Sequence, residues 1–208
     1  MGHAPLPSPD AEPSLMVMPD TAGRGTRDAK RWTREAVRAL PVDGRRYELV
    51  DGELLVSPSP RGVHQVAVSA LERRVHDALD GTGVAHVLHS PADLTLGEEE
   101  ILQPDLFVYR TATGRHLLAW TDITELVLVI EVLSPSTAHY DRYLKRLRYQ
   151  RARVPEYWIV DLDGRVIERW RPDDTRPEIL AERLQWEPDE GVVLSLDLPA
   201  YFREVWGE

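Results

Sequence analysis

Apolar and polar positions follow two different periods along this chain, and the changes of period predict its elements. The segment YELVDGELLV alternates on either side of Asp51–Gly52, a dipeptide that strongly favours a two-residue hairpin turn. In residues 63–79, apolar side chains instead recur at the spacing of a helix. The elements expected, in chain order, are a helix over 33–40, a hairpin over 47–60, a helix over 63–79, strands over 85–96, 101–110 and 125–133, a helix over 140–153, a hairpin over 156–170 that turns at Asp163–Gly164, strands over 179–186 and 192–196, and a short amphipathic end.

The order of these elements indicates the fold class. Hairpin, helix, three strands, helix and hairpin do not alternate as they would in a doubly wound parallel sheet. The run ELVLVIEVL, residues 125–133, is apolar without alternation, which is typical of a strand buried on both faces. We therefore predict an α/β protein, α+β-like in its arrangement, with a mixed β-sheet core flanked by helices.

Composition bounds the size and setting of this fold. The 208 residues suit one domain, which we place over residues 30–208. Residues 1–29 contain five prolines and little apolar periodicity, so they are predicted to form a disordered leader. No apolar run reaches the roughly 18 residues of a membrane span, so we expect no membrane partner. No secretory signal is readable and cysteine is absent, so we expect a cytoplasmic location. The formal net charge of −10 opposes non-specific binding to nucleic acid.

A carboxylate interrupts the strand predicted over 125–133. Burying Glu131 without a partner would cost on the order of several kcal/mol, so a protein cation, a metal ion or exposure at the strand end has to compensate it. Asp105 stands near the start of the preceding strand, and antiparallel pairing would bring the two carboxylates side by side. Mg²⁺ or Mn²⁺ would relieve their repulsion. The alternative is that Asp105 caps a strand end in solvent and Glu131 pairs with an arginine.

The helix predicted over 140–153 runs against the acidic balance of the chain. Residues 141–153 contain six basic side chains and one acid. Its expected apolar stripe is Tyr140, Leu144 and Leu147. The candidates for holding DNA phosphates are Arg142, Arg146 and Arg148. The alternative is a plain solvated face, on which Asp141 and Lys145 form an exposed ion pair at i, i+4 spacing.

Six short motifs carry a resemblance to a known family. They are, in order, YELVDGEL, SPSPRGVHQ, QPDLFV, VIEVLSPST, DRYLK and VPEYWIVD. Together they resemble the Uma family, a bacterial group of restriction-endonuclease-like proteins in the PD-(D/E)XK nuclease superfamily, over roughly residues 31–197. The resemblance implies a mixed sheet flanked by helices and a site in which acidic residues bind Mg²⁺ while a lysine assists the attack of water.

The resemblance also implies roles for individual residues. Asp105 matches the aspartate of the PD motif and Glu131 the following acid, so these two side chains and the Val132 carbonyl are the implied metal ligands. The superfamily pattern has lysine two residues after that acid, where this chain has Leu133. Lys145, from the next helix, is the implied substitute. Two further residues match the family pattern, Glu48 as a third ligand or support and His64 as either a catalytic or a structural histidine.

Three functions remain open on the sequence. The first is a Mg²⁺-dependent (or Mn²⁺-dependent) DNA endonuclease, for which a homodimer would allow both strands to be cut. The second is a catalytically silent module of the nuclease fold that binds DNA or protein, favoured by Leu133 and the acidic balance. The third is a carboxylate-pair hydrolase of another substrate, such as a glycoside, although no aromatic subsite can be located. No zinc site is indicated, because cysteine is absent and the seven histidines lack ligand spacing.

Overall fold

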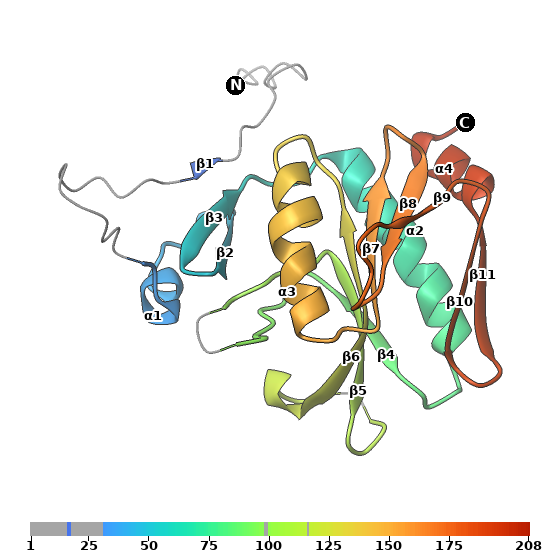
Figure 1. Cartoon of the computed structure of the whole chain (residues 1–208), viewed down its shortest axis with the longest axis horizontal. Coiled ribbons are helices and arrows are strands. Elements are labelled where there is room, and N and C mark those ends of the chain that lie inside the picture. Colours follow the sequence, from blue (N-terminus) through green and yellow to red (C-terminus); the bar gives the residue numbers. More distant parts are fainter. Residues whose placement is uncertain (1–15, 18–30, 98–99, 116) are drawn as a thin grey trace, which may run out of the picture.

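A six-stranded sheet forms the core of the computed structural model, which describes residues 16–17, 31–97, 100–115 and 117–208 (Figure 1). The strands lie in sequence order from β4 to β9, and every neighbouring pair is antiparallel except β6 and β7. Their bounds are β4 His86–His89, β5 Leu106–Thr111, β6 Ile123–Val132, β7 Glu156–Asp161, β8 Val166–Trp170 and β9 Glu178–Leu180, with a short 3-10 turn, Trp120–Asp122, before β6. The predicted mixed sheet flanked by helices is confirmed.

Different elements cover the two faces of this sheet. One face packs against four elements, α2 (Gly62–Leu79), the antiparallel pair β10 (Arg183–Asp189) and β11 (Val192–Asp197), and α4 (Leu198–Trp206). The other face packs against a π-helical turn (Tyr140–Lys145) and the helix α3 (Arg146–Arg151) that continues it. In Figure 1, α3 lies in front of the sheet and α2 behind it. Because successive residues of a strand face opposite sides, Ile130 of β6 joins the α2 core and Val129 joins the α3 core.

The predicted hairpin around Asp51–Gly52 forms as β2 (Arg46–Val50) and β3 (Glu53–Ser57). Both turn residues have positive φ, 54° at Asp51 and 80° at Gly52. A two-residue turn of this kind matches the twist of the strands and requires that backbone, which explains the Asp-Gly preference. The short helix α1 (Arg34–Arg38), capped by Thr33, buries its Val37 against the hairpin.

Several strand bounds differ from the predicted ones. The strand expected over 85–96 ends at His89, since Pro91 has no N–H with which to continue a ladder. The strand expected from residue 101 begins only at Leu106, as β5. Pro104, two residues earlier, likewise has no N–H with which to join a ladder. The strand expected over 179–186 divides between β9 and β10, which belong to different sheets.

The helix predicted over 140–153 is present, and two residues of its predicted apolar stripe, Tyr140 and Leu144, are partly buried against the core, but the third is exposed and the fully buried positions are different ones. Leu147 is 40% exposed. The buried positions are instead Asp141, Lys145 and Tyr149, each four residues apart and no more than 2% exposed. Hydrophobic spacing cannot reveal this face, because two of its three members are charged.

Two further expectations concern the N-terminal segment and the membrane. From the predicted leader the structure describes the two-residue strand β1 (Met16–Val17), which pairs with β3. Residues 1–15 and 18–29 lie outside the described residues, so the disorder of the leader stays a prediction. Within the described ranges, no helix is both long and apolar enough to cross a bilayer.

Candidate active site

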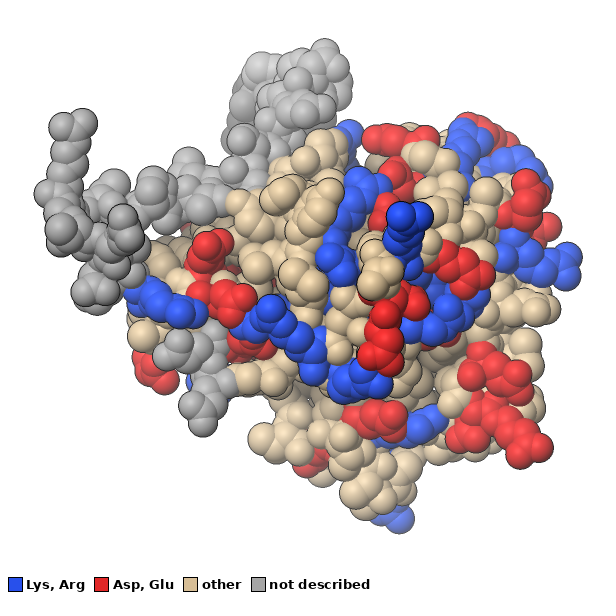
Figure 2. Space-filling model, in the orientation of Figure 1, with Lys and Arg blue, Asp and Glu red and all other residues tan. Residues whose placement is uncertain are grey.

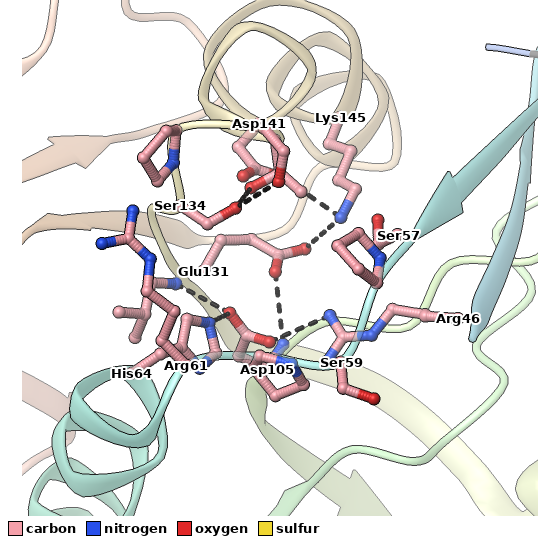
Figure 3. Close-up of a pocket in the computed structure, with 16 residues that line it drawn as sticks. Arg46, Ser57, Ser59, Arg61, His64, Asp105, Glu131, Ser134, Asp141 and Lys145 are labelled. Atoms are coloured by element: carbon pink, nitrogen blue, oxygen red, sulfur yellow. Dashed lines mark hydrogen bonds and ion pairs between the residues drawn. The ribbon is translucent and has the colours of Figure 1, made fainter. Parts of the chain in front are cut away.

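A small cavity opens where the end of β6, the start of β5, the start of α2 and the π-helical turn meet (Figure 3). Its volume is about 40 Å³, and one ordered water needs roughly 10–15 Å³, so it has room for an ion and very few waters. Two Ser-Pro loops, residues 57–60 and 134–137, contribute to its walls. The ionisable side chains that line it are Arg46, Arg61, His64, Asp105, Glu131, Asp141 and Lys145.

Asp105 and Glu131 face this cavity from paired strands. Asp105 directly precedes β5, in a register that puts it opposite Glu131. Both point to the α3 side, because Asp105 is two residues from Phe107 and Glu131 two from Val129. The Val132 N–H donates to Asp105 Oδ2 at 2.9 Å, and the Asp105 N–H donates to Glu131 Oε2 at 3.3 Å. Asp105 is only 4% exposed, so the alternative of a solvent-exposed strand cap is wrong.

Lys145 is the protein cation that compensates Glu131. Its Nζ donates to Glu131 Oε1 at 3.1 Å and lies 3.0 Å from Glu48 Oε2 and 3.1 Å from Asp141 Oδ1. All four side chains are at most 3% exposed, so the Asp141–Lys145 pair is buried and not the exposed one considered above. Burial alone would lower the pKa of Lys145, but the three carboxylates raise it well above its usual value. The ammonium therefore stays charged.

The strand β2 brings two charged residues to this cluster. Glu48 Oε1 accepts a hydrogen bond from the Gln103 N–H at 2.8 Å, which leaves Oε2 for Lys145. Arg46 stands two residues earlier, and its Nη1 donates to Asp105 Oδ1 at 2.9 Å. The predicted site does not include Arg46. Its two-residue spacing from Glu48, which puts both on one face of a strand, is the signal that could have found it.

The π-helical turn sets the positions of Asp141 and Lys145. Here the Arg146 N–H donates to the Asp141 carbonyl, five residues back instead of four. The Tyr157 hydroxyl donates to the same carbonyl at 3.0 Å and ties the turn to β7. Asp141 is the second residue that the predicted site lacks. Once Lys145 is taken to point inward, the i, i+4 spacing requires Asp141 to point inward too.

His64 approaches Asp105 from the start of α2. Its Nε2 lies 3.0 Å from Asp105 Oδ2, and the side chain is one-tenth exposed. This contact suits both the structural and the catalytic interpretation of His64. Burial would raise the pKa of Asp105, but the hydrogen bond from His64 and the charge of Arg46 outweigh burial and hold that pKa well below its usual value.

Buried carboxylates outnumber fixed cations in this cluster. The carboxylates are Glu48, Asp105, Glu131 and Asp141, and the permanent cations are Arg46 and Lys145. Two negative charges therefore have no permanent counter-charge. Burial raises the pKa of Glu131 well above its usual value, Lys145 offsets only part of the rise, and the neighbouring carboxylates add to it. Burial also raises the pKa of Asp141.

This excess of buried negative charge fits a divalent cation. Across the described part of the chain, no group of three or more His, Asp and Glu side chains forms a metal site by itself. Asp105 and Glu131 nevertheless offer hard oxygen ligands, and the Val132 carbonyl stays the expected third donor. Mg²⁺ commonly takes one or two carboxylates from a protein and completes its shell with water and phosphate oxygens. The residues present therefore fit Mg²⁺ or Mn²⁺.

The three arginines expected to hold DNA make internal contacts. These are Arg142 with Asp161 (2.8 Å) and Glu168 (2.7 Å), Arg148 with Asp51 and with Glu100 (2.6 Å), and Arg146 over the ring of Trp170 (4.4 Å to its centre). Figure 2 shows basic and acidic side chains interleaved on the face that carries α3. None of the three arginines lines the cavity described above. Their role in DNA binding stays a prediction.

Comparisons with known proteins agree with this architecture. Residues 34–201 match the family model Uma2, described as "Putative restriction endonuclease". Among solved structures, the chain is similar to one described as a "putative nuclease belonging to DUF820 from Anabaena variabilis ATCC 29413", with a TM-score of 0.69 and 19% identity, over 84% of this chain and 99% of that chain. At this identity the likeness shows the fold alone. The search of curated proteins found no match.

Proposed function

This chain belongs to the Uma2 family, and from that premise we propose that it is a DNA endonuclease that hydrolyses phosphodiester bonds with Mg²⁺ or Mn²⁺. One observation carries the proposal. Asp105 and Glu131 face one cavity from paired strands, with the Lys145 ammonium 3.1 Å from Glu131 and an excess of buried negative charge around them. This arrangement would supply both a cation site and a fixed positive charge beside it.

Phosphodiester hydrolysis joins a water oxygen to phosphorus and breaks one ester bond, while negative charge grows on the phosphate oxygens. A divalent cation held by Asp105, Glu131 and the Val132 carbonyl would polarise the phosphate and lower the pKa of the attacking water. Lys145 would stabilise the growing charge as a fixed cation. It would not accept a proton, because three carboxylates keep it charged.

The remaining residues of the cluster would act through the three side chains Asp105, Glu131 and Lys145. Glu48 and Asp141 hold the Lys145 ammonium at 3.0 and 3.1 Å and so act as positioning residues for it. His64 orients Asp105 through its 3.0 Å contact. This division of roles predicts larger losses of activity from Asp105, Glu131 and Lys145 than from the residues that support them.

Arg61 is the residue we expect to hold a DNA phosphate beside the cavity. It is exposed, it lines the cavity, and it has no carboxylate partner among the described residues. Replacing it, as Arg61→Gln, should weaken binding to a labelled duplex and reduce the slope of log affinity against log salt by about one. Arg176→Gln, at an exposed arginine outside the cavity, is the matched control and should leave the slope unchanged. An equal slope in both variants would remove Arg61 from the interface.

A catalytically silent DNA-binding or protein-interaction module is the second candidate. It is favoured by the protein groups that already contact the carboxylates, since Arg46 and the His64 ring contact Asp105 and Lys145 contacts Glu131. Incubating the full chain with supercoiled plasmid in Mg²⁺, in Mn²⁺ or in EDTA separates the two functions. The endonuclease predicts nicked or linear plasmid with either metal and intact plasmid in EDTA. DNA binding with no cleavage in any of the three would favour the silent module.

Plasmid cleavage would also bear on the expected homodimer. The described part of one chain offers one candidate site, so cutting both strands at one place would need a second copy, which a symmetric dimer would supply. Linear plasmid formed without a nicked intermediate would support such a dimer.

A further inference from the structure

Arg46 holds the oxygen that a divalent cation would need. Its Nη1 donates to Asp105 Oδ1 at 2.9 Å and to the Gln103 carbonyl at 3.0 Å. In Figure 3 its guanidinium reaches Asp105 from the side opposite His64. We propose that Arg46 competes with the divalent cation for Asp105, and that a DNA phosphate relieves this competition, so that the metal and DNA bind cooperatively. This inference rests on the proposed function and adds to it how the site is loaded.

Both oxygens of Asp105 are occupied by donors. Oδ1 accepts from Arg46, while Oδ2 accepts from the Val132 N–H at 2.9 Å and lies 3.0 Å from His64 Nε2. A cation that binds Asp105 would also lie close to a guanidinium of the same sign of charge. Coulomb repulsion between them acts at short range in a site that water reaches poorly. Metal binding and the present position of Arg46 therefore oppose each other.

Arg46 is the donor best able to leave. The Val132 N–H is fixed in the strand β6, and the His64 side chain is one-tenth exposed at the start of a long helix. Arg46 stands at the first residue of β2, and its side chain is 21% exposed. It also lines a neighbouring cavity of about 410 Å³, together with Arg45, which gives its guanidinium a place to go without a change in the backbone.

A DNA phosphate at the active site would give the displaced guanidinium a new partner. Arginine binds phosphate through paired N–H groups, so the exchange replaces one charge-assisted hydrogen bond by another. Without DNA, the metal has to separate Arg46 from Asp105 with no replacement for the lost contact. By linkage, DNA should then strengthen metal binding, and metal should strengthen DNA binding by the same factor.

The first experiment measures Mn²⁺ binding to the full chain from the electron paramagnetic resonance signal of free Mn²⁺. Arg46→Met keeps much of the side-chain volume and removes the competing charge. It should bind Mn²⁺ at least about tenfold more tightly than the parent, because a like charge near the ion is gone. Arg46→Lys keeps the charge and should stay near the parent. Arg45→Met, at an adjacent arginine that is 57% exposed and paired with Asp43, is the matched control and should bind as the parent does.

The second experiment repeats the titration with a short duplex whose phosphorothioate linkages resist hydrolysis. The duplex should tighten Mn²⁺ binding to the parent and have a much smaller effect on Arg46→Met. A melting curve gives a readout that does not depend on DNA. Without metal, Arg46→Met should melt below the parent, because Asp105 has lost a partner, and Mn²⁺ should raise its melting temperature by more.

The outcomes separate this inference from the proposed function. If Arg46→Met binds Mn²⁺ no more tightly than the parent, or gains as much from the duplex, the competition is absent even if the parent cuts DNA. If neither protein binds Mn²⁺, both the competition and the metal-dependent function are wrong. If Arg46→Met binds Mn²⁺ more tightly but the parent never cuts DNA, the competition between Arg46 and the metal would be supported and the proposed nuclease function would be wrong.

Discussion

Lys145→Met is expected to lower the free energy of unfolding by about 3–5 kcal/mol, the range seen when one partner of a buried ion pair is removed. Viewed from the sequence, this change keeps the packing of the stem and should leave folding intact. The structure changes that expectation, because the Lys145 ammonium is buried among Glu48, Glu131 and Asp141. Methionine would leave three buried carboxylates with no cation from the π-helical turn.

Thermal and urea unfolding of the metal-free protein would measure this loss. For a chain of this size, each kcal/mol corresponds to roughly 2–4 °C in melting temperature. Arg146→Met is the matched control on the same helix, because its guanidinium rests on Trp170, a contact worth about 1 kcal/mol or less at a partly exposed site. Equal melting temperatures for the two variants would contradict the central place given to Lys145.

The dependence on pH gives a second signature of Lys145→Met. Without the ammonium, the pKa of the Glu131 carboxyl should rise further above its usual value. A folded-state pKa above the unfolded one means that the folded protein binds the proton more tightly, so stability increases as pH falls. The variant should therefore recover part of its lost stability when pH is lowered from 8 toward the ordinary glutamate pKa of about 4.3.

Catalysis should suffer more than stability. At a temperature where Lys145→Met is fully folded by circular dichroism, plasmid cleavage should fall by about 10²–10³-fold, the cost of removing one positioned electrostatic donor. Mn²⁺ binding should persist, because Asp105 and Glu131 remain and a competing positive charge is gone. Cleavage equal to that of the parent would show that Lys145 only balances charge.

The positions of Asp105 and Glu131 could be predicted from the sequence because strand geometry is strict. An acid within an apolar run needs a partner, and a two-residue period decides which face it joins. The same reasoning could have identified Arg46, which is two residues from Glu48 in β2 and so lies on the same face of that strand. It does not reach the contact between Arg46 and Asp105, because that contact depends on how the hairpin β2–β3 packs against the large sheet.

The apolar pattern of the helix over 140–153 correctly identified Tyr140 and Leu144 as packed against the core, but it could not identify the fully buried charged positions. Hydrophobic spacing chose Leu147, which is 40% exposed, because it assumes that buried positions are apolar. Here the sheet presents Glu131 to the helix, so the complementary face is charged. The π-helical turn contains one more residue than an α-helical turn and so shifts which residues of the helix face the sheet. No residue type in that segment predicts it.

The basic run over residues 141–153, which stands out in an acidic chain, has a different meaning once the ion-pair partners of its arginines are known. The arginines of the π-helical turn and α3 form a basic run in sequence. In space, however, Arg142 contacts carboxylates of β7 and β8, and Arg148 contacts Asp51 in the β2–β3 turn and Glu100 in a loop. A run of like charges shows only what one segment offers. Its partners come from segments far away in the chain, which a local pattern cannot identify.

Glu131→Gln and Asp105→Asn are expected to abolish metal-dependent cleavage alike and to change stability in opposite directions. Each removes one of the two carboxylates proposed to hold the cation, so Mn²⁺ binding and cleavage should both be lost. Glu131→Gln also removes one carboxylate from a cluster in which buried carboxylates outnumber permanent cations. Because the pKa of Glu131 is raised, we expect the metal-free variant to gain about 0.5–2 kcal/mol at pH 8. Asp105 has a lowered pKa, which means that its surroundings stabilise its charge, so Asp105→Asn should lose about 1–3 kcal/mol.

The pH dependence fixes the sign of each effect. The raised pKa of Glu131 makes the parent lose stability as pH rises above the unfolded value near 4.5, so the advantage of Glu131→Gln should grow from pH 5 to pH 8. The lowered pKa of Asp105 stabilises the parent above about pH 3.8, and this contribution fades as pH falls below that value, so the deficit of Asp105→Asn should shrink in acid. Urea unfolding of metal-free protein at several pH values measures both trends. A Glu131→Gln variant that melts below the parent at pH 8 would mean that Glu131 is fully compensated by Lys145, and the excess charge that we assign to a divalent cation would not exist.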